Sequence, residues 1–227
     1  MNVNEFLSAM EYTNIRMSER HTVIKLGKKF TPIYIVLYKN KSLLGDTIRN
    51  VTKEPFSHVA ISFDTSMHNM FAFGIAPVKN GKKVEFINGA LRESLGERNN
   101  RYSYDKTTKY GIYTMFVEDG ILTKLKNRVR KIYNNRKKYK FNIPGLVKYA
   151  FGQESKSETM MFCSQFVSKI LEESGAAKLE RDSSLYSPWQ ITSLKNIIHV
   201  EDDIISNFDK NRIDQIMDKI SNDFRTS

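Results

Sequence analysis

The period of the hydrophobic residues changes near Asp119-Gly120, and this change restricts the possible folds more than any other feature of the sequence. Before it, β-branched and aromatic runs of strand length are separated by turn residues. After it, apolar residues recur at helical spacing. The expected strands are residues 31–38, 57–63, 69–74 and 109–118. Strands followed by helices predict an α+β fold in which an antiparallel sheet packs against helices.

Turn and capping residues add detail to this outline. Asn80-Gly81, between Val78 and Val84, predicts a β-hairpin, because a type I′ turn needs two positive φ values. Gly175 is expected to end a helix that begins at Cys163. Short helices are expected at residues 3–12, 43–51 and 146–151, and longer ones from 121 and from 203. We divide the chain into an N-terminal extension (1–30), one α+β domain (31–200) and a C-terminal helical extension (201–227).

Composition limits the class of protein. The 227 residues include 36 Lys+Arg and 25 Asp+Glu, a formal net charge of +11, and a single cysteine. One cysteine cannot form an internal disulfide, which favours a reducing compartment. The apolar runs are far shorter than the roughly 20 residues of a transmembrane helix, and the first residues lack the pattern of a signal peptide. We therefore expect a cytoplasmic protein. Its net positive charge is compatible with an acidic partner.

Two residues have the chemistry of a nucleophile and its base. Cys163 begins a helix, where unpaired N–H groups favour the thiolate, and the first-turn amides could help form an oxyanion hole. His58 lies near the start of a strand, which would hold its imidazole on a rigid element. Taken alone, a cysteine on an apolar helix face and a histidine in a strand are more often structural than catalytic.

A family resemblance is carried by the same residues. Phe56-Ser-His-Val-Ala-Ile-Ser-Phe63, Met70-Phe-Ala-Phe-Gly74 and, about a hundred residues later, Met161-Phe-Cys-Ser-Gln-Phe-Val167 resemble the circularly permuted NlpC-type papain-like superfamily. Its members include YiiX-like enzymes and, more distantly, lecithin retinol acyltransferase. There the histidine strand precedes the cysteine helix, as His58 precedes Cys163 here. The similarity extends from Pro32 to about Pro188.

The resemblance implies a permuted papain-like fold and acyl chemistry. Cys163 would attack an amide, ester or thioester carbonyl and His58 would move the proton, in a cysteine-dependent hydrolase or acyltransferase, with an amidase or peptidase in first place. A third polar group usually orients the histidine in such enzymes. The strand after His58 offers none, so we rank His68 first, with Asn69 and Glu93 as alternatives. His68 could equally be an exposed turn residue.

The rival function is a non-catalytic binding or assembly protein on the same scaffold. An acid-free basic stretch supports it. This stretch could follow the phosphates of a nucleic acid, with Tyr133 and Tyr139 available for stacking, or it could contact the headgroups of an anionic membrane or an acidic partner. It could also be an ordinary solvated helix face. Its nine basic residues are Lys124, Lys126, Arg128, Arg130, Lys131, Arg136, Lys137, Lys138 and Lys140.

Two further expectations concern ligands and the C-terminus. The cysteine and the four histidines show no metal-ligand spacing and the chain has no glycine-rich phosphate loop, so we expect no metal and no cofactor. The apolar stripe of the C-terminal helix, from Ile204 to Ile220, is expected to pack on its own chain, while the acidic face could meet the basic helix or a partner. That face consists of Asp202, Asp203, Asp209, Asp214 and Asp218.

Overall fold

The structure is a computed structural model that describes residues 18–39, 53–80, 83–95 and 107–227. Within these residues it contains an antiparallel sheet of seven strands, a two-stranded parallel pair and four α-helices. The strands are β1 (Val23–Lys25), β2 (Lys28–Tyr38), β3 (His58–Ser62), β4 (Met70–Asn80), β5 (Lys83–Glu93), β6 (Lys109–Glu118), β7 (Lys140–Phe141), β8 (Met160–Met161) and β9 (Ile198–Ile204). The helices are α3 (Asp119–Asn134), α4 (Ile143–Ala150), α5 (Cys163–Ser174) and α6 (Lys210–Thr226).

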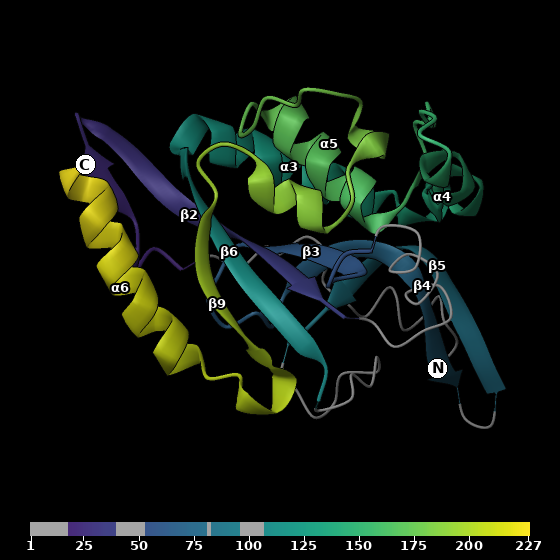
Figure 1. Cartoon of the computed structure of the whole chain (residues 1–227), viewed down its shortest axis with the longest axis horizontal. Helices are drawn as coiled ribbons and strands as arrows, with labels where there is room; N and C mark the ends of the chain where they lie inside the picture. The colour runs from purple at the N-terminus through teal and green to yellow at the C-terminus, as the bar shows by residue number, and fades with distance from the viewer. Residues whose placement is uncertain (1–17, 40–52, 81–82, 96–106) are drawn as a thin grey trace.

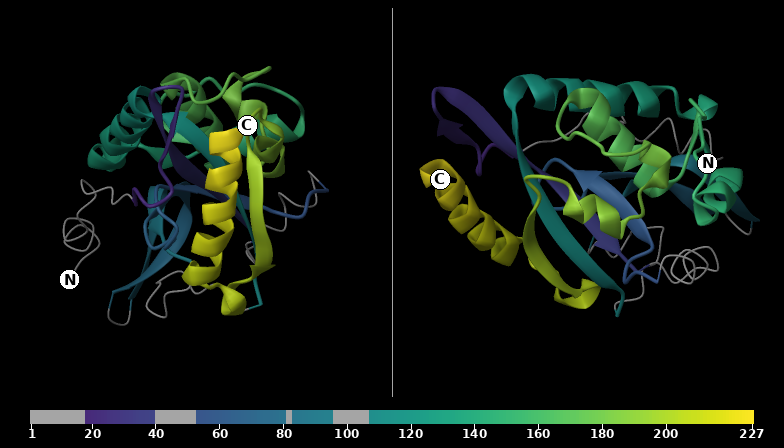
Figure 2. Two further views of the ribbon diagram at one scale, coloured as in Figure 1. Left: turned by 90° about the vertical axis from the view of Figure 1, so that its left-hand side faces the viewer. Right: turned by 45° about the horizontal axis from the view of Figure 1, so that its top comes forward.

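The large sheet has the strand order β5-β4-β3-β2-β6-β9, and β1 pairs with β2. Helices α3 and α5 lie together over one face, with α4 at the end of that layer, and α6 runs along the other face beside β9 (Figures 1 and 2). The predicted α+β architecture, an antiparallel sheet packed against helices with a helix at the C-terminus, is confirmed.

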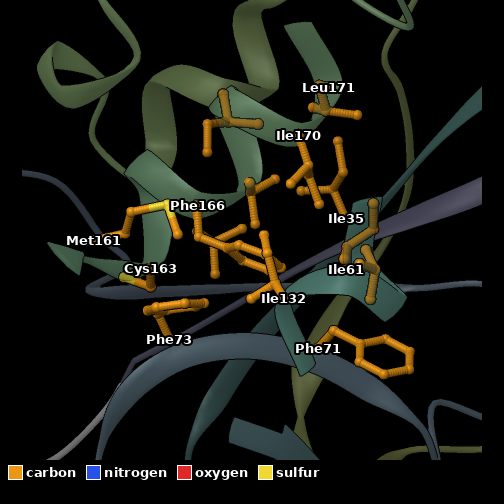
Figure 3. Close-up of a cluster of buried hydrophobic side chains, with 14 of the residues drawn as sticks. Ile35, Ile61, Phe71, Phe73, Ile132, Met161, Cys163, Phe166, Ile170 and Leu171 are labelled. Atoms are coloured by element: carbon orange, nitrogen blue, oxygen red, sulfur yellow. The ribbon is translucent and has the colours of Figure 1, made fainter. Parts of the chain in front are cut away.

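Two hydrophobic cores follow from this arrangement. The larger core joins the sheet to the buried stripe of α3 and to α5, and it contains Ile35, Ile61, Phe73 and Phe166 (Figure 3). The smaller core lies between the opposite face of the sheet and α6. Alternate residues of β2 enter the two cores, as the period of a strand with both faces covered requires.

Most of the expected elements that fall on described residues are present. The strand at 109–118 has the predicted limits, and α5 begins at Cys163 and ends at Gly175, whose φ of 83° gives the left-handed C-cap. The hairpin is present, but Asn80, expected in its turn, is the last residue of β4 and pairs with Lys83. The helices expected at 3–12 and 43–51 lie outside the described residues.

The C-terminal region differs from the prediction. The helix starts at Lys210, capped by the Asp209 side chain, instead of near residue 203. Residues from Ile198 to Ile204 form β9, which pairs with β6, so the expected boundary at 200 falls inside a strand of the sheet. Residues 23–25 and 28–30, expected in an N-terminal extension, also belong to the sheet. β9 is an edge strand with half-exposed residues, which weakens its alternation in the sequence.

A close backbone contact fixes β7 against the hairpin. Gly89 in β5 has φ 125°, and a Cβ there would lie 2.3 Å from the carbonyl oxygen of Tyr139. The Asn88 side chain accepts a hydrogen bond from the N–H of Phe141 at 2.7 Å. Because a glycine permits this approach, the chain between α3 and α4 is held against β5.

Candidate functional site

His58 is the first residue of β3 and is buried, with 7% of its surface exposed. Its neighbour across the β2–β3 pair is Tyr38, and the two rings lie 4.7 Å apart, centroid to centroid. Gly74 of β4 lies beside the imidazole, since a Cβ there would lie 3.7 Å from Cε1 of His58, an ordinary packing distance. The imidazole is therefore held by strands on both sides of it.

A buried carboxyl group lies against one nitrogen of this imidazole. Glu93, the last residue of β5, has both carboxyl oxygens 3.2 Å from Nε2 of His58. The Tyr38 hydroxyl donates a hydrogen bond to the same carboxyl group. With Nε2–H donating to Glu93, Nδ1 of His58 is the nitrogen that can accept a proton. Tyr38, His58 and Glu93 thus form a buried hydrogen-bonded chain from three strands.

Cys163 is the first residue of α5 and is also buried, at 2% exposure. Phe162 before it provides no side-chain cap, and the backbone N–H groups of Val59 and Ser164 face the sulfur. Val59 directly follows His58, so the thiol lies against the start of β3. Figure 3 shows the sulfur beside Phe73 at the sheet end of α5.

Strands β3 and β4 pair over only a short length, and this lets Cys163 of α5 approach the backbone of β3. The described register between β3 and β4 contains one pair, Ile61 opposite Phe71. Nearer the start of β3, the N–H of Val59 faces the sulfur of Cys163. The gap between β3 and β4 therefore places the thiol next to the strand that carries His58.

Burial determines the protonation of both groups. It raises the pKa of the Cys163 thiol to about 12, although the N–H groups of Val59 and Ser164 act in the opposite direction. It also lowers the pKa of His58 to about 3. Both shifts favour the uncharged form, so at neutral pH the site holds a neutral thiol and a neutral imidazole.

His68, ranked first as the third group, lies in the turn before β4. Its side chain is exposed, and Nδ1 lies 3.3 Å from the hydroxyl of Ser94. The structure brings Glu93 to His58 instead. Tyr38 was not singled out from the sequence at all, because a tyrosine in a run of buried strand residues has the pattern of an ordinary core residue.

The basic stretch forms the outer side of α3 and the turn that follows. Lys124, Lys131, Lys137, Lys138 and Lys140 are exposed, whereas Lys126, Arg128, Arg130 and Arg136 are half-buried. Arg128 pairs with Glu173 of α5, with 2.5 Å between its Nε and the carboxylate. The positive surface is therefore densest at residues 137–140 and partly neutralised along the helix.

The expectation that tyrosines of this stretch are available for stacking is wrong. Tyr133 is completely buried, and its hydroxyl donates to the carbonyl groups of Ala72 and Leu91. Tyr139 is 9% exposed and packs edge-on against Phe73. Both rings belong to the core, because the apolar face of α3 and the chain after it lie on the sheet.

The expected acidic face of the C-terminal helix is wrong in part, because Asp202 and Asp203 belong to β9 and Asp209 is the N-cap of α6. Asp214 and Asp218 lie on α6, on the side of the sheet away from α3, and do not meet the basic helix.

Asp214 is 1% exposed and accepts hydrogen bonds from Thr65, Arg20 and Lys210. Asp218 pairs with Arg20 at 2.8 Å. The pairs with Arg20 join α6 to the turn before β1, in addition to the contact of its apolar stripe with the sheet, whereas Lys210 belongs to α6 itself.

The described part of the chain has neither a cluster of metal-ligand side chains nor a helix that could span a membrane. Residues 18–39, 53–80, 83–95 and 107–227 contain no cluster of three or more His, Cys, Asp or Glu side chains suited to a metal ion. None of the helices described there has the length and apolar character needed to span a bilayer.

Comparison with protein-family models, with curated proteins and with solved structures found no match to this chain.

Proposed function

We propose that the protein is a cysteine-dependent hydrolase or acyltransferase of the permuted papain-like type. Cys163 is the nucleophile, His58 the general base and Glu93 the group that orients the imidazole. The observation that carries this proposal is the position of His58. Its Nε2 lies 3.2 Å from a buried carboxyl group, and its backbone adjoins the sulfur of the single cysteine.

Because the thiol of Cys163 and the imidazole of His58 are both uncharged before the reaction, proton transfer accompanies the attack on the substrate. The thiol proton moves to Nδ1 of His58 as the sulfur attacks the carbonyl carbon, and Glu93 stabilises the imidazolium through Nε2–H. The N–H groups at the start of α5 stabilise the negative oxygen of the tetrahedral intermediate. His58 then gives its proton to the leaving amine, alcohol or thiol, and water or an amine resolves the acyl-enzyme.

Tyr38 is a positioning residue in this scheme. Its hydroxyl occupies part of the hydrogen-bonding capacity of Glu93, and its ring packs on the imidazole. Removal of either Tyr38 or Glu93 leaves His58 free to turn, so the base loses its orientation. His68 has no role in the proposal beyond its contact with Ser94 next to Glu93.

The substrate is an amide, ester or thioester, and an amidase or peptidase remains the first choice. A non-catalytic binding or assembly protein is the second candidate. The burial of Cys163 and His58 favours this second candidate. It raises the pKa of the thiol and lowers the pKa of the imidazole, and both changes oppose formation of a thiolate–imidazolium pair.

Formation of an acyl-enzyme tests the proposal. With p-nitrophenyl acetate as an activated acyl donor, we expect a burst of p-nitrophenolate and one acetyl group on Cys163, found by peptide mass spectrometry. His58→Asn should slow acylation by about a hundredfold or more, and Glu93→Gln by less. Cys163→Ser controls for acetylation of surface lysines. Acetylation of Cys163 at equal rates in the wild type and in His58→Asn would contradict the proposal.

A further inference from the structure

Helix α4 carries a second set of apolar residues on its solvent-exposed side. Ile143, Val147 and Phe151 are 49%, 56% and 76% exposed, and Pro144 and Ala150 are exposed as well. These positions are spaced as i, i+1, i+4, i+7 and i+8, which places them on one stripe of the helix. We call these five residues the α4 apolar face.

The opposite side of α4 is firmly attached to the domain. Leu146 and Tyr149 pack against the larger core, and the ring of Tyr149 lies 6.1 Å from that of Phe162. Asn142 caps the helix by accepting from the N–H of Gly145 at 2.8 Å, and its amide donates to Ser155. The α4 apolar face is therefore held in a fixed position toward solvent.

Exposed lysines lie on this helix and close to it in the chain. Lys148 is an exposed residue of α4 itself, and the exposed Lys137, Lys138 and Lys140 come shortly before it in the chain. Residues 136–160 contain six basic and two acidic residues, a net charge of +4. One of those acids, Glu154, already has Lys156 3.5 Å away. An exposed apolar stripe in a basic, lysine-rich part of the chain matches the acyl and headgroup layers of an anionic bilayer.

We propose that α4 docks the protein on anionic phospholipid membranes, with its apolar face in the interface and Lys137, Lys138, Lys140 and Lys148 on the headgroups. A second copy of the chain fits less well, because two lysine-rich regions would repel each other. Nucleic acid also fits less well. Tyr133 and Tyr139 are buried and cannot stack on bases, and an apolar stripe makes no favourable contact with phosphates. The inference does not depend on Cys163 being catalytic.

Vesicle flotation with the full chain tests the proposal. We expect binding to phosphatidylcholine vesicles that contain phosphatidylserine, weakened by added salt and by omission of phosphatidylserine. The double variant Val147→Ser/Phe151→Ser should bind about tenfold more weakly or worse. Lys137→Glu/Lys138→Glu should also lose about tenfold or more. Because all four side chains are exposed, each variant should melt at the wild-type temperature.

The chain supplies a matched control at the β1–β2 turn. Ile24 and Leu26 are 70% and 93% exposed and also lie among lysines, so Ile24→Ser/Leu26→Ser removes comparable apolar surface elsewhere. This variant should bind as the wild type does. Equal weakening by both serine variants would overturn the assignment to α4, as would binding to nucleic acid without binding to vesicles, or self-association through α4.

A fluorescent reporter separates insertion from simple charge attraction. In Phe151→Trp, the new indole is expected to shift its emission to shorter wavelength on these vesicles and to be quenched by lipids that carry a shallow spin label. Trp189 is the one native tryptophan and provides the background signal in the wild type. Binding without a shift or quenching would contradict the insertion of α4. Cys163→Ala should bind vesicles as the wild type does, whatever the outcome of the acylation test.

Discussion

The burial of His58 predicts a specific loss of stability on acidification. Its pKa is lowered from about 6.5 to about 3, so the folded protein keeps the imidazole neutral while the unfolded chain binds a proton below pH 6.5. The stabilisation is fully present above that pH and is lost as the pH falls towards 3. Each pH unit within this window costs about 1.4 kcal/mol. Between pH 7 and pH 5, His58 alone should reduce the free energy of unfolding by about 2 kcal/mol.

Urea unfolding of the wild type and of His58→Asn at both pH values measures this contribution. The variant should lose about 2 kcal/mol less than the wild type over the interval, whatever its stability at pH 7. His21, whose pKa burial also lowers, is present in both proteins and so cancels in the comparison. Equal losses in the two proteins would refute the conclusion that His58 is neutral in the folded state. A larger loss in the variant would mean that His58 holds a proton there and pairs as a cation with Glu93.

Three further substitutions test the packing around the site. Tyr133→Phe should cost about 1 to 3 kcal/mol in urea unfolding, because two buried carbonyl groups lose a hydrogen-bond donor. Gly89→Ala should lower the melting temperature far more than Gly152→Ala: both glycines have positive φ, but a Cβ meets a carbonyl oxygen at 2.3 Å in the first case and nothing within 4 Å in the second. Asp214→Asn should weaken the attachment of α6, seen as faster amide exchange in that helix, because a buried carboxylate that accepts from Thr65 loses its charge.

Helices and strands could be predicted where the hydrophobic residues have a strong periodicity and where capping or turn residues mark the ends of the element. Strand β6 and helix α5 have the expected limits, the first as a fully buried apolar run and the second because Gly175 supplies the C-cap. Strand β9 was missed, because its alternation is weak at the edge of the sheet and acidic residues interrupt it. Only pairing with β6 identifies it as a strand.

The candidate site shows where sequence reasoning stops. Cys163 and His58 could be selected because each residue type is rare in this chain. The carboxyl group beside His58 could not, since it depends on the register of the β4–β5 hairpin. A turn centred on Asn80-Gly81 would place Glu93 opposite His68, whereas the observed register places it opposite Met70. The two registers differ by two residues along β4, so Glu93 keeps the same face in both, but the register sets how far along the sheet its carboxyl group lies.

The exposed face of α4 could not be recognised from its sequence either. Its apolar spacing is that of a helix that covers a core, and the structure alone turns that stripe outward. The buried tyrosines of the basic stretch are the reverse case. Aromatic residues between lysines have the pattern of a binding surface, but α3 directs Tyr133 into the sheet.

The pH dependence of Cys163 alkylation tests the central proposal most directly. If His58 removes the thiol proton during attack, the rate with iodoacetamide should be nearly constant between about pH 6 and about pH 8, and it should fall in His58→Asn and Glu93→Gln. A buried thiol without a base should instead react about tenfold faster for each pH unit, at a rate unchanged by either substitution. The first result would establish a Cys163–His58–Glu93 relay, and the second would contradict it.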